Sequence, residues 1–200
     1  MEFGIQTIAI TGISESLKAA GNAMRTQMDL DYTTITEQDL SRGVKLGTTR
    51  VGEGHDNYLN GITVHFNLWA PLYMWKQIQR YHFLDFISSQ STMHKLTSFP
   101  IKEQCVSDVD TEILDRYQEL LDEYRLDQES GRIEDAHTIW RKLVASLPSG
   151  FVLGATMVTN YRQLKTIYFQ RRNHKLKEWH EFCAWCESLP YFKEFCIGDK

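Results

Sequence analysis

The clearest alternation of apolar and polar side chains lies in residues 62–69. Apolar side chains occupy every second position from Ile62 to Leu68, and the positions between them are mostly polar. This period of two predicts a strand that is covered on one face. Pro71 follows and predicts a helix start, since proline is tolerated in the first turn of a helix. Looser patterns predict two further strands, at residues 5–10 and 151–158.

Apolar residues at three- and four-residue steps predict the helices. The clearest case is residues 107–127, where the predicted apolar side consists of Ile113, Tyr117, Leu120, Leu121 and Tyr124. Residues 133–146 predict a second helix, which ends before a Pro-Ser-Gly turn. Further helices are expected at residues 14–28, 37–44, 160–172, 174–188 and 191–196. Few strands among many helices predict a single α+β domain over residues 1–200.

The balance of charged side chains limits the kinds of molecule that the protein is expected to bind. The 200 residues include 22 basic and 26 acidic side chains, for a net charge of -4. This balance argues against a general nucleic-acid binder, which needs an excess of cations to displace counterions. No apolar run approaches the roughly 20 residues that span a bilayer, and the first residues lack a signal-peptide pattern. We therefore expect a cytoplasmic protein, in the host cytoplasm if viral, with no nucleic-acid or membrane partner.

One segment could bind a metal ion, because it combines imidazole and thiol groups. His180, Cys183 and Cys186 are zinc-type ligands within seven residues. The segment is predicted to be one continuous helix, where steps of three and six residues let the side chains diverge. Buried packing is the better explanation of these cysteines, and no metal site is predicted.

Two groups of residues could bind an anionic, planar ligand. Helical spacing predicts that Gln77, Arg80, Tyr81 and Leu84 share one face, so an amide and a guanidinium could aim at one ligand. Asn160, Arg162 and Arg171 surround a strand-to-helix junction, where backbone and side-chain donors can converge on an anion. Each group also has an ordinary explanation, since arginine often lies along a helix surface and asparagine often caps a helix.

Several familiar motifs are missing from the sequence. It has no G-x-S-x-G elbow, no Walker loop and no G-x-G-x-x-G. Acyl transfer and classical dinucleotide folds therefore lose support, whereas carbon transfer on a bound base remains open.

The spacing of the two groups resembles that of one known family. The run from Gly54-His55 through Ala70-Pro71 to Gln77 and Arg80 is similar, without gaps, to the flavin-dependent thymidylate synthases, also called thymidylate synthase complementing proteins. A Leu-Pro pair at residues 147–148, where a predicted helix ends, is followed by Asn160-x-Arg162-x-Leu164 and Arg171. This order is similar to the second half of the family's sequence. The resemblance covers most of residues 50–190.

The resemblance implies an architecture and a reaction. The fold would be a single α+β domain with a small, mainly antiparallel sheet and several helices. The subunits would form a homotetramer that shares its sites between subunits and binds FAD. The reaction would be reductive methylation of dUMP to dTMP, with methylenetetrahydrofolate and NADPH as co-substrates.

The resemblance also implies roles for residues. Arg171 would be the catalytic arginine held against the pyrimidine, where a guanidinium stabilises the negative charge that forms when a hydride or nucleophile adds at C6. The flavin contacts would be His55, Asn57, Arg80, Tyr81, His82, Ser88, Asn160, Arg162 and Thr166. The nucleotide contacts would be Gln77, Arg80, Ser88, Ser89, Gln90, Ser91, Thr92 and Arg171.

The chain departs from the family at its signature, Arg-His-Arg-x-x-Ser-x-Asn-Glu-x-Ser-x-Arg. Residues 80–92 retain only the first arginine, and Thr92 replaces the last, phosphate-facing one. Val144 stands where another arginine is expected, and Thr166 replaces a flavin-contacting asparagine. Losing two cations predicts phosphate binding weaker by a few kcal/mol, unless a lysine such as Lys76, Lys95 or Lys142 substitutes.

These departures leave three hypotheses open. The first is an enzyme that methylates C5 of dUMP or of a related nucleotide such as dCMP, whose exocyclic amine could donate to Asp85. The second is a nucleotide- or flavin-binding module of the same fold that has lost catalysis. The third, an oligomer-forming structural protein without a ligand, explains the paired arginines least well.

Overall fold

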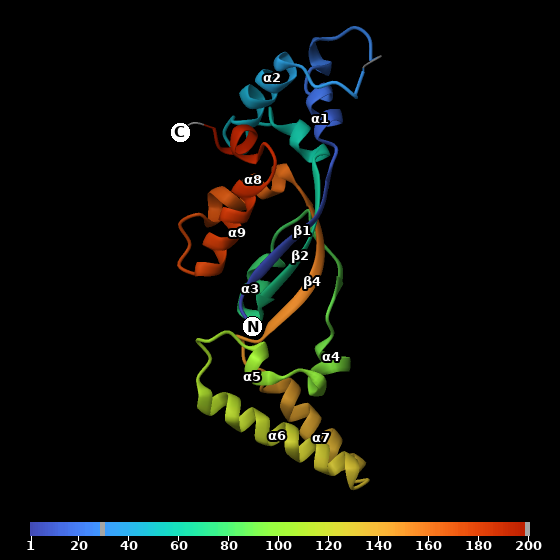
Figure 1. Cartoon of the computed structure of the whole chain (residues 1–200), viewed down its shortest axis with the longest axis vertical. Coiled ribbons are helices and arrows are strands. Elements are labelled where there is room, and N and C mark those ends of the chain that lie inside the picture. The colour runs from blue at the N-terminus through green and yellow to red at the C-terminus, as the bar shows by residue number, and fades with distance from the viewer. Residues whose placement is uncertain (29–30, 199–200) are drawn as a thin grey trace. The chain divides into compact units, whose positions relative to one another are not determined.

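In the computed structural model, which describes residues 1–28 and 31–198, four strands form one antiparallel sheet in the order β1-β2-β4-β3 (Figure 1). The strands are β1 (Gly4–Thr11), β2 (Thr63–Pro71), β3 (Leu84–Ser89) and β4 (Val152–Asn160). The predicted strands at residues 5–10, 62–69 and 151–158 are confirmed. β2 alternates buried and half-buried side chains as the period of two predicted. The fold is therefore of the predicted α+β class.

The chain divides into two compact units, and every strand contributes residues to both. Unit 1 consists of Met1–Gly4, Leu68–Arg80 and Ser88–Ala155. Unit 2 consists of Ile5–Asn67, Tyr81–Ile87 and Thr156–Lys200. The boundary between the units therefore falls inside the strands.

Unit 1 is built around a pair of long helices. Its helices are α3 (Leu72–Ile78), α4 (Thr92–Lys95), η3 (Leu96–Ser98), α5 (Ile101–Gln104), α6 (Thr111–Glu129) and α7 (Ile133–Ala145). α6 and α7 lie side by side as a hairpin (Figure 1). Tyr117 in this hairpin donates its hydroxyl to the Leu143 carbonyl at 2.8 Å. The predicted apolar side of α6 was wrong at one position, because Ile113 is 52% exposed and Leu114 is buried in its place.

Unit 2 contains the helices at both ends of the chain. They are α1 (Ile13–Ala19), η1 (Asn22–Met24), α2 (Glu37–Gly47), η2 (Asn57–Gly61), α8 (Tyr161–Arg171), α9 (Lys177–Ser188) and η4 (Lys193–Ile197). The helix predicted over residues 14–28 was too long, since α1 ends at Ala19, just before the weak helix former Gly21.

The predicted helical face of Gln77, Arg80, Tyr81 and Leu84 was also wrong. α3 ends at Ile78, and Leu84 is the first residue of β3. Leu84 is buried as the strand begins to pair with β4. Pairing with β4 places this segment in the sheet, and local spacing carries no information about such a distant partner.

A capping box fixes the start of α2. Thr36 Oγ1 accepts from Asp39 N at 3.2 Å, and the Asp39 carboxylate accepts from Thr36 N at 3.1 Å. The same carboxylate pairs with Lys18 at 2.7 Å and with Arg42 at 3.1 Å. The hydrogen bond from Lys18 is the main reason that the pKa of Asp39 lies well below its usual range.

We expect Asp39→Asn to lower the free energy of unfolding by about 2–3 kcal/mol near neutral pH, because it removes hydrogen bonds to a charged group. The folded-state pKa is depressed, so this stability is complete above the ordinary aspartate pKa of about 3.9. It declines as the pH falls below that value towards the folded pKa. Thermal denaturation of both proteins across this range should show the gap in stability closing in acid. A gap independent of pH would contradict a role for the charge.

Candidate functional site

A cavity of about 230 Å³ lies in unit 2 where β4 passes into α8, and we call it the α8 cavity. Its lining residues come from the segment before β2, from the residue before β3 and from the start of α8: Val51, Gly52, Asp56, Asn60, Phe83, Asn160, Arg162, Gln163 and Thr166. The structure thus brings together three of the residues that the family resemblance assigns to flavin. These are Asn160, Arg162 and Thr166.

Asn160 begins α8 and fixes its first turn. Its backbone is extended, and its side-chain Oδ1 accepts from Gln163 N at 2.9 Å. The predicted capping role of this asparagine is therefore confirmed. The amide nitrogen at the other end of the side chain carries two donors. The start of the helix adds the partial positive charge of its dipole, so this edge of the cavity suits an anion.

A buried ion network holds Arg162 beside the cavity. Asp56, with a side chain 2% exposed, accepts from Arg162 Nε at 3.0 Å and from Lys165 Nζ at 2.6 Å. Lys165 Nζ also donates to the Gly47 carbonyl at 2.8 Å and to the Thr49 carbonyl at 2.6 Å. An ammonium has three donors, so all three of them are satisfied. The network ties α8 to the end of α2 and to η2.

The network leaves the cavity with a net positive character. One carboxylate faces two cations, and Arg162 is the cation that lines the cavity. Arg162 is 35% exposed and, among the described residues, uses only Nε in this pairing. Its four other N–H donors can meet phosphate or carbonyl oxygens of a ligand.

Arg171, at the far end of α8, is held by aromatic side chains. Its guanidinium carbon lies 4.7 Å from the Trp179 ring centroid and 5.4 Å from that of Tyr81. Its Nε donates to the Tyr81 hydroxyl at 2.6 Å, and that hydroxyl donates to Gln170 Oε1 at 3.1 Å. These contacts orient the planar guanidinium.

His174 lies near this guanidinium and stays neutral. Burial and the neighbouring positive charge of Arg171 lower the pKa of His174. Its Nδ1 accepts a hydrogen bond from Leu176 N at 3.1 Å, which agrees with an uncharged ring.

The remaining predicted flavin residues lie outside the lining of the α8 cavity. His55 and Asn57 are exposed and flank Asp56, while His82 is exposed just before Phe83. Tyr81 contacts Arg171 instead. Arg80 is exposed and belongs to unit 1, whereas Arg171 belongs to unit 2. Their predicted convergence on one ring stays a prediction.

Most of the predicted nucleotide residues in unit 1 lie at the end of β3 and in the segment that leads into α4. Gln90 is bound to Gly154 twice, through its backbone N at 2.9 Å and its Oε1 at 2.8 Å. Ser91 caps α4 by accepting from His94 N at 3.2 Å. Thr92 is the first residue of α4, Ser88 and Ser89 are exposed, and Gln77 is half-buried in α3. Two of these side chains, those of Gln90 and Ser91, thus already accept hydrogen bonds from backbone N–H groups.

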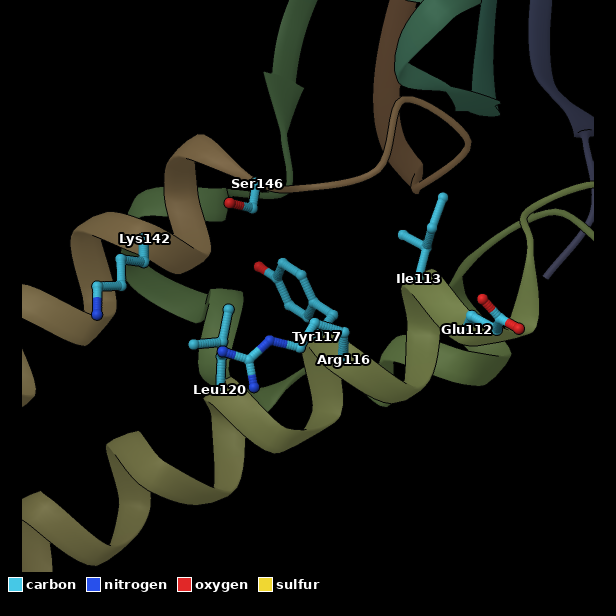
Figure 2. A pocket seen from close by; sticks show the side chains of 7 residues that line it. All are labelled: Glu112, Ile113, Arg116, Tyr117, Leu120, Lys142 and Ser146. Carbon is cyan, nitrogen blue, oxygen red and sulfur yellow. The ribbon is translucent and has the colours of Figure 1, made fainter.

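Unit 1 contains a larger cavity of about 550 Å³ on the hairpin of α6 and α7 (Figure 2). It is lined by Glu112, Ile113, Arg116, Tyr117, Leu120, Lys142 and Ser146. Arg116 already pairs with the exposed Glu119 at 2.6 Å, and Lys142 is exposed. No predicted ligand residue lines this cavity, apart from Lys142 as a possible replacement cation. The candidate site is therefore the α8 cavity.

The cysteines of α9 pack in the core. Cys183 and Cys186 are buried, and burial raises the pKa of Cys183 to about 11 and that of Cys186 well above its ordinary value. Such thiols stay protonated at neutral pH, whereas zinc binds thiolates. Within residues 1–28 and 31–198, no group of three or more His, Cys, Asp or Glu side chains is arranged to hold a metal ion. In the same ranges, no helix has the length and apolarity to cross a membrane.

The site residues that sequence reasoning missed include Asp56, Lys165 and Phe83. The burial of Lys165 could have been inferred from the sequence, because this lysine lies on the helix face of the apolar residues Tyr161 and Leu164. A lysine on an apolar face needs a buried partner. Neither Asp56 nor Phe83 carried any comparable local signal.

Two crystal structures of the flavin-dependent thymidylate synthase ThyX from Helicobacter pylori resemble the whole chain. The first, complexed with FAD and dUMP, has a TM-score of 0.71 and 15% identity over 100% of this chain and 99% of that one. The second, also with FAD and dUMP, has a TM-score of 0.71 and 14% identity over 99% and 98%. No protein-family model and no curated protein sequence matches the chain. At this identity the likeness establishes the fold.

Proposed function

We propose that this protein is an FAD-dependent enzyme that methylates C5 of a pyrimidine deoxynucleotide, converting dUMP to dTMP or acting on a related substrate such as dCMP. Methylenetetrahydrofolate would supply the carbon and NADPH the electrons. Residues 1–200 would act as one domain of a cytoplasmic homotetramer that shares its sites between subunits. The observation that carries the proposal is the α8 cavity, which gathers Asn160, Arg162 and Thr166 in a fold whose solved examples contain FAD and dUMP.

The residues of the α8 cavity fit one part of FAD. Its volume of about 230 Å³ is below the roughly 300–1,000 Å³ typical of pockets that enclose a drug-sized ligand. A phosphate group could meet Arg162 and the start of α8, where a cation and the helix dipole act together. The rest of the cofactor would then extend beyond this cavity.

The chain's own residues would bind and orient the reactants. Asp56 and Lys165 fix the position of Arg162, which would bind an anionic group of the cofactor. Arg171, fixed by Tyr81 and Trp179, would stabilise negative charge on the pyrimidine. The bound flavin supplies the redox chemistry, and the protein provides orientation and electrostatics.

Titration with FAD tests the proposal. The protein should bind FAD, with visible absorbance and a raised melting temperature. We expect Arg162→Ala to weaken this binding about 10- to 100-fold, because a charge-assisted hydrogen bond contributes roughly 1.5–3 kcal/mol. Arg172→Ala is the matched control, since this arginine caps the end of α8, has its guanidinium carbon 5.0 Å from the Phe169 ring centroid and does not line the cavity.

The outcomes separate clearly. A colourless protein that FAD does not stabilise would refute the flavoenzyme proposal. Equal losses in Arg162→Ala and Arg172→Ala would show that general positive charge, and not this cavity, binds the cofactor.

A second candidate is a flavin- or nucleotide-binding module without catalysis. The observation in its favour is that the side chains of Gln90 and Ser91, at signature positions, already accept hydrogen bonds from backbone N–H groups. Incubation with dUMP or dCMP, methylenetetrahydrofolate and NADPH decides between the two. A product heavier by one methyl group supports the enzyme, whereas FAD binding without product from either nucleotide supports the module.

A further inference from the structure

The α8 cavity has one aromatic lining residue, Phe83, and its backbone is unusual. Its φ is 59°, in the left-handed region that bulky side chains rarely adopt. The family signature leaves this position variable, so the resemblance assigns it no role. A phenylalanine here costs conformational energy that a glycine would not.

The surrounding structure imposes this conformation from both sides. The buried Thr159, at the end of β4, donates its hydroxyl to the Phe83 carbonyl at 2.7 Å. The next residue, Leu84, is buried as the first residue of β3. Residue 83 is therefore held in place between a side-chain hydrogen bond and a buried strand.

Burial of the Phe83 ring does not offset the cost of this backbone conformation. Phe83 is 68% exposed, so it does not serve the core. An exposed apolar side chain alone is ordinary. A strained backbone that presents an exposed ring into a cavity is different, because such strain gathers at ligand-binding sites.

We propose that the Phe83 ring is a stacking platform for a planar ring of the flavin cofactor, an inference that rests on the proposed function. Phe83 and Arg162 line the same cavity and offer a flat apolar surface beside a cation. A simple anion would leave the ring unused, and a purely apolar ligand would leave the guanidinium unused. A planar heterocycle that carries phosphate uses both, as FAD does.

The first test compares FAD affinity among variants of similar size. Phe83→Leu keeps an apolar side chain without a flat ring and should weaken FAD binding about 5- to 100-fold, the range found for losing one aromatic stacking partner. Phe83→Tyr keeps the ring and should bind FAD like the wild type. Phe83→Trp should also bind, and its indole should quench the fluorescence of the bound flavin.

The second test separates strain from binding. Phe83→Gly should raise the melting temperature of the FAD-free protein by about 2–6 °C, because glycine tolerates this φ, and it should weaken FAD binding. Tyr191→Gly is the matched control: its φ is 58° and it does not line the cavity. It loses the stacking of Tyr191 on Phe195 but should leave FAD affinity unchanged.

Each result has a definite meaning. Equal FAD affinity in the wild type, Phe83→Leu and Phe83→Gly would overturn the stacking role and leave the proposed function standing. Failure of the wild type to bind FAD would overturn both. A fall in FAD affinity with Phe83→Leu and Phe83→Gly, but not with Phe83→Tyr or Tyr191→Gly, would support the inference.

Discussion

Replacing Lys165 by methionine should lower the free energy of unfolding by about 3–5 kcal/mol, the range for removing one partner of a buried ion pair. Lys165 is 1% exposed, and its ammonium binds Asp56 and the carbonyls of Gly47 and Thr49. Methionine fills a similar volume but leaves these acceptors without their donor. Chemical denaturation of the two proteins measures the loss. Lys175→Met, at an exposed lysine, should change stability by less than about 0.5 kcal/mol.

A double variant tests which interaction causes the predicted loss of unfolding free energy. Most of the loss should come from the uncompensated charge of Asp56, so adding Asp56→Asn to Lys165→Met should recover part of it. Simple additivity of the two losses would contradict this account. A loss below about 1 kcal/mol for Lys165→Met alone would refute it.

Arg171→Ala should reduce turnover at least 100- to 1,000-fold, the usual effect of removing one electrostatic stabiliser of a developing charge. The guanidinium is fixed by its Nε bond to Tyr81, at 2.6 Å, and by the Trp179 ring. Arg171→Lys should not restore activity, because a lysine ammonium lacks the planar fork. The measurement is the rate of methyl transfer to the nucleotide with saturating FAD, so that cofactor binding does not limit the rate.

Two further variants test the reason for this effect. Tyr81→Phe keeps the ring but removes the hydroxyl that accepts from Arg171, so it should lower kcat more than it raises KM. Arg172→Ala alters the neighbouring arginine and should retain activity. An active Arg171→Ala protein with a normal folding profile would rule out the role assigned to this residue.

Local sequence patterns predicted the elements whose stability depends on their own residues. The alternation in β2, the proline that caps α3 and the Asn160 cap of α8 act within a few positions, so they can be found from spacing. The helices α6 and α7 followed their apolar periodicity, with bounds shifted by a few residues. The family resemblance, carried by short motifs, agreed with the fold of the solved structures.

The candidate site depended on partners that are distant in the chain. Asp56 and Lys165 are 109 positions apart, and no periodicity links them. β3 pairs with β4, and Leu84 therefore lies in a strand and not on the helix face that the spacing of Arg80 and Leu84 predicted. The sequence alone determined β1, β2, β4 and most of the helices, and it placed Arg162 at the start of α8. Only the tertiary structure decided which charges are buried together and how Phe83 is held, because burial and strand pairing are properties of residues that meet only after folding.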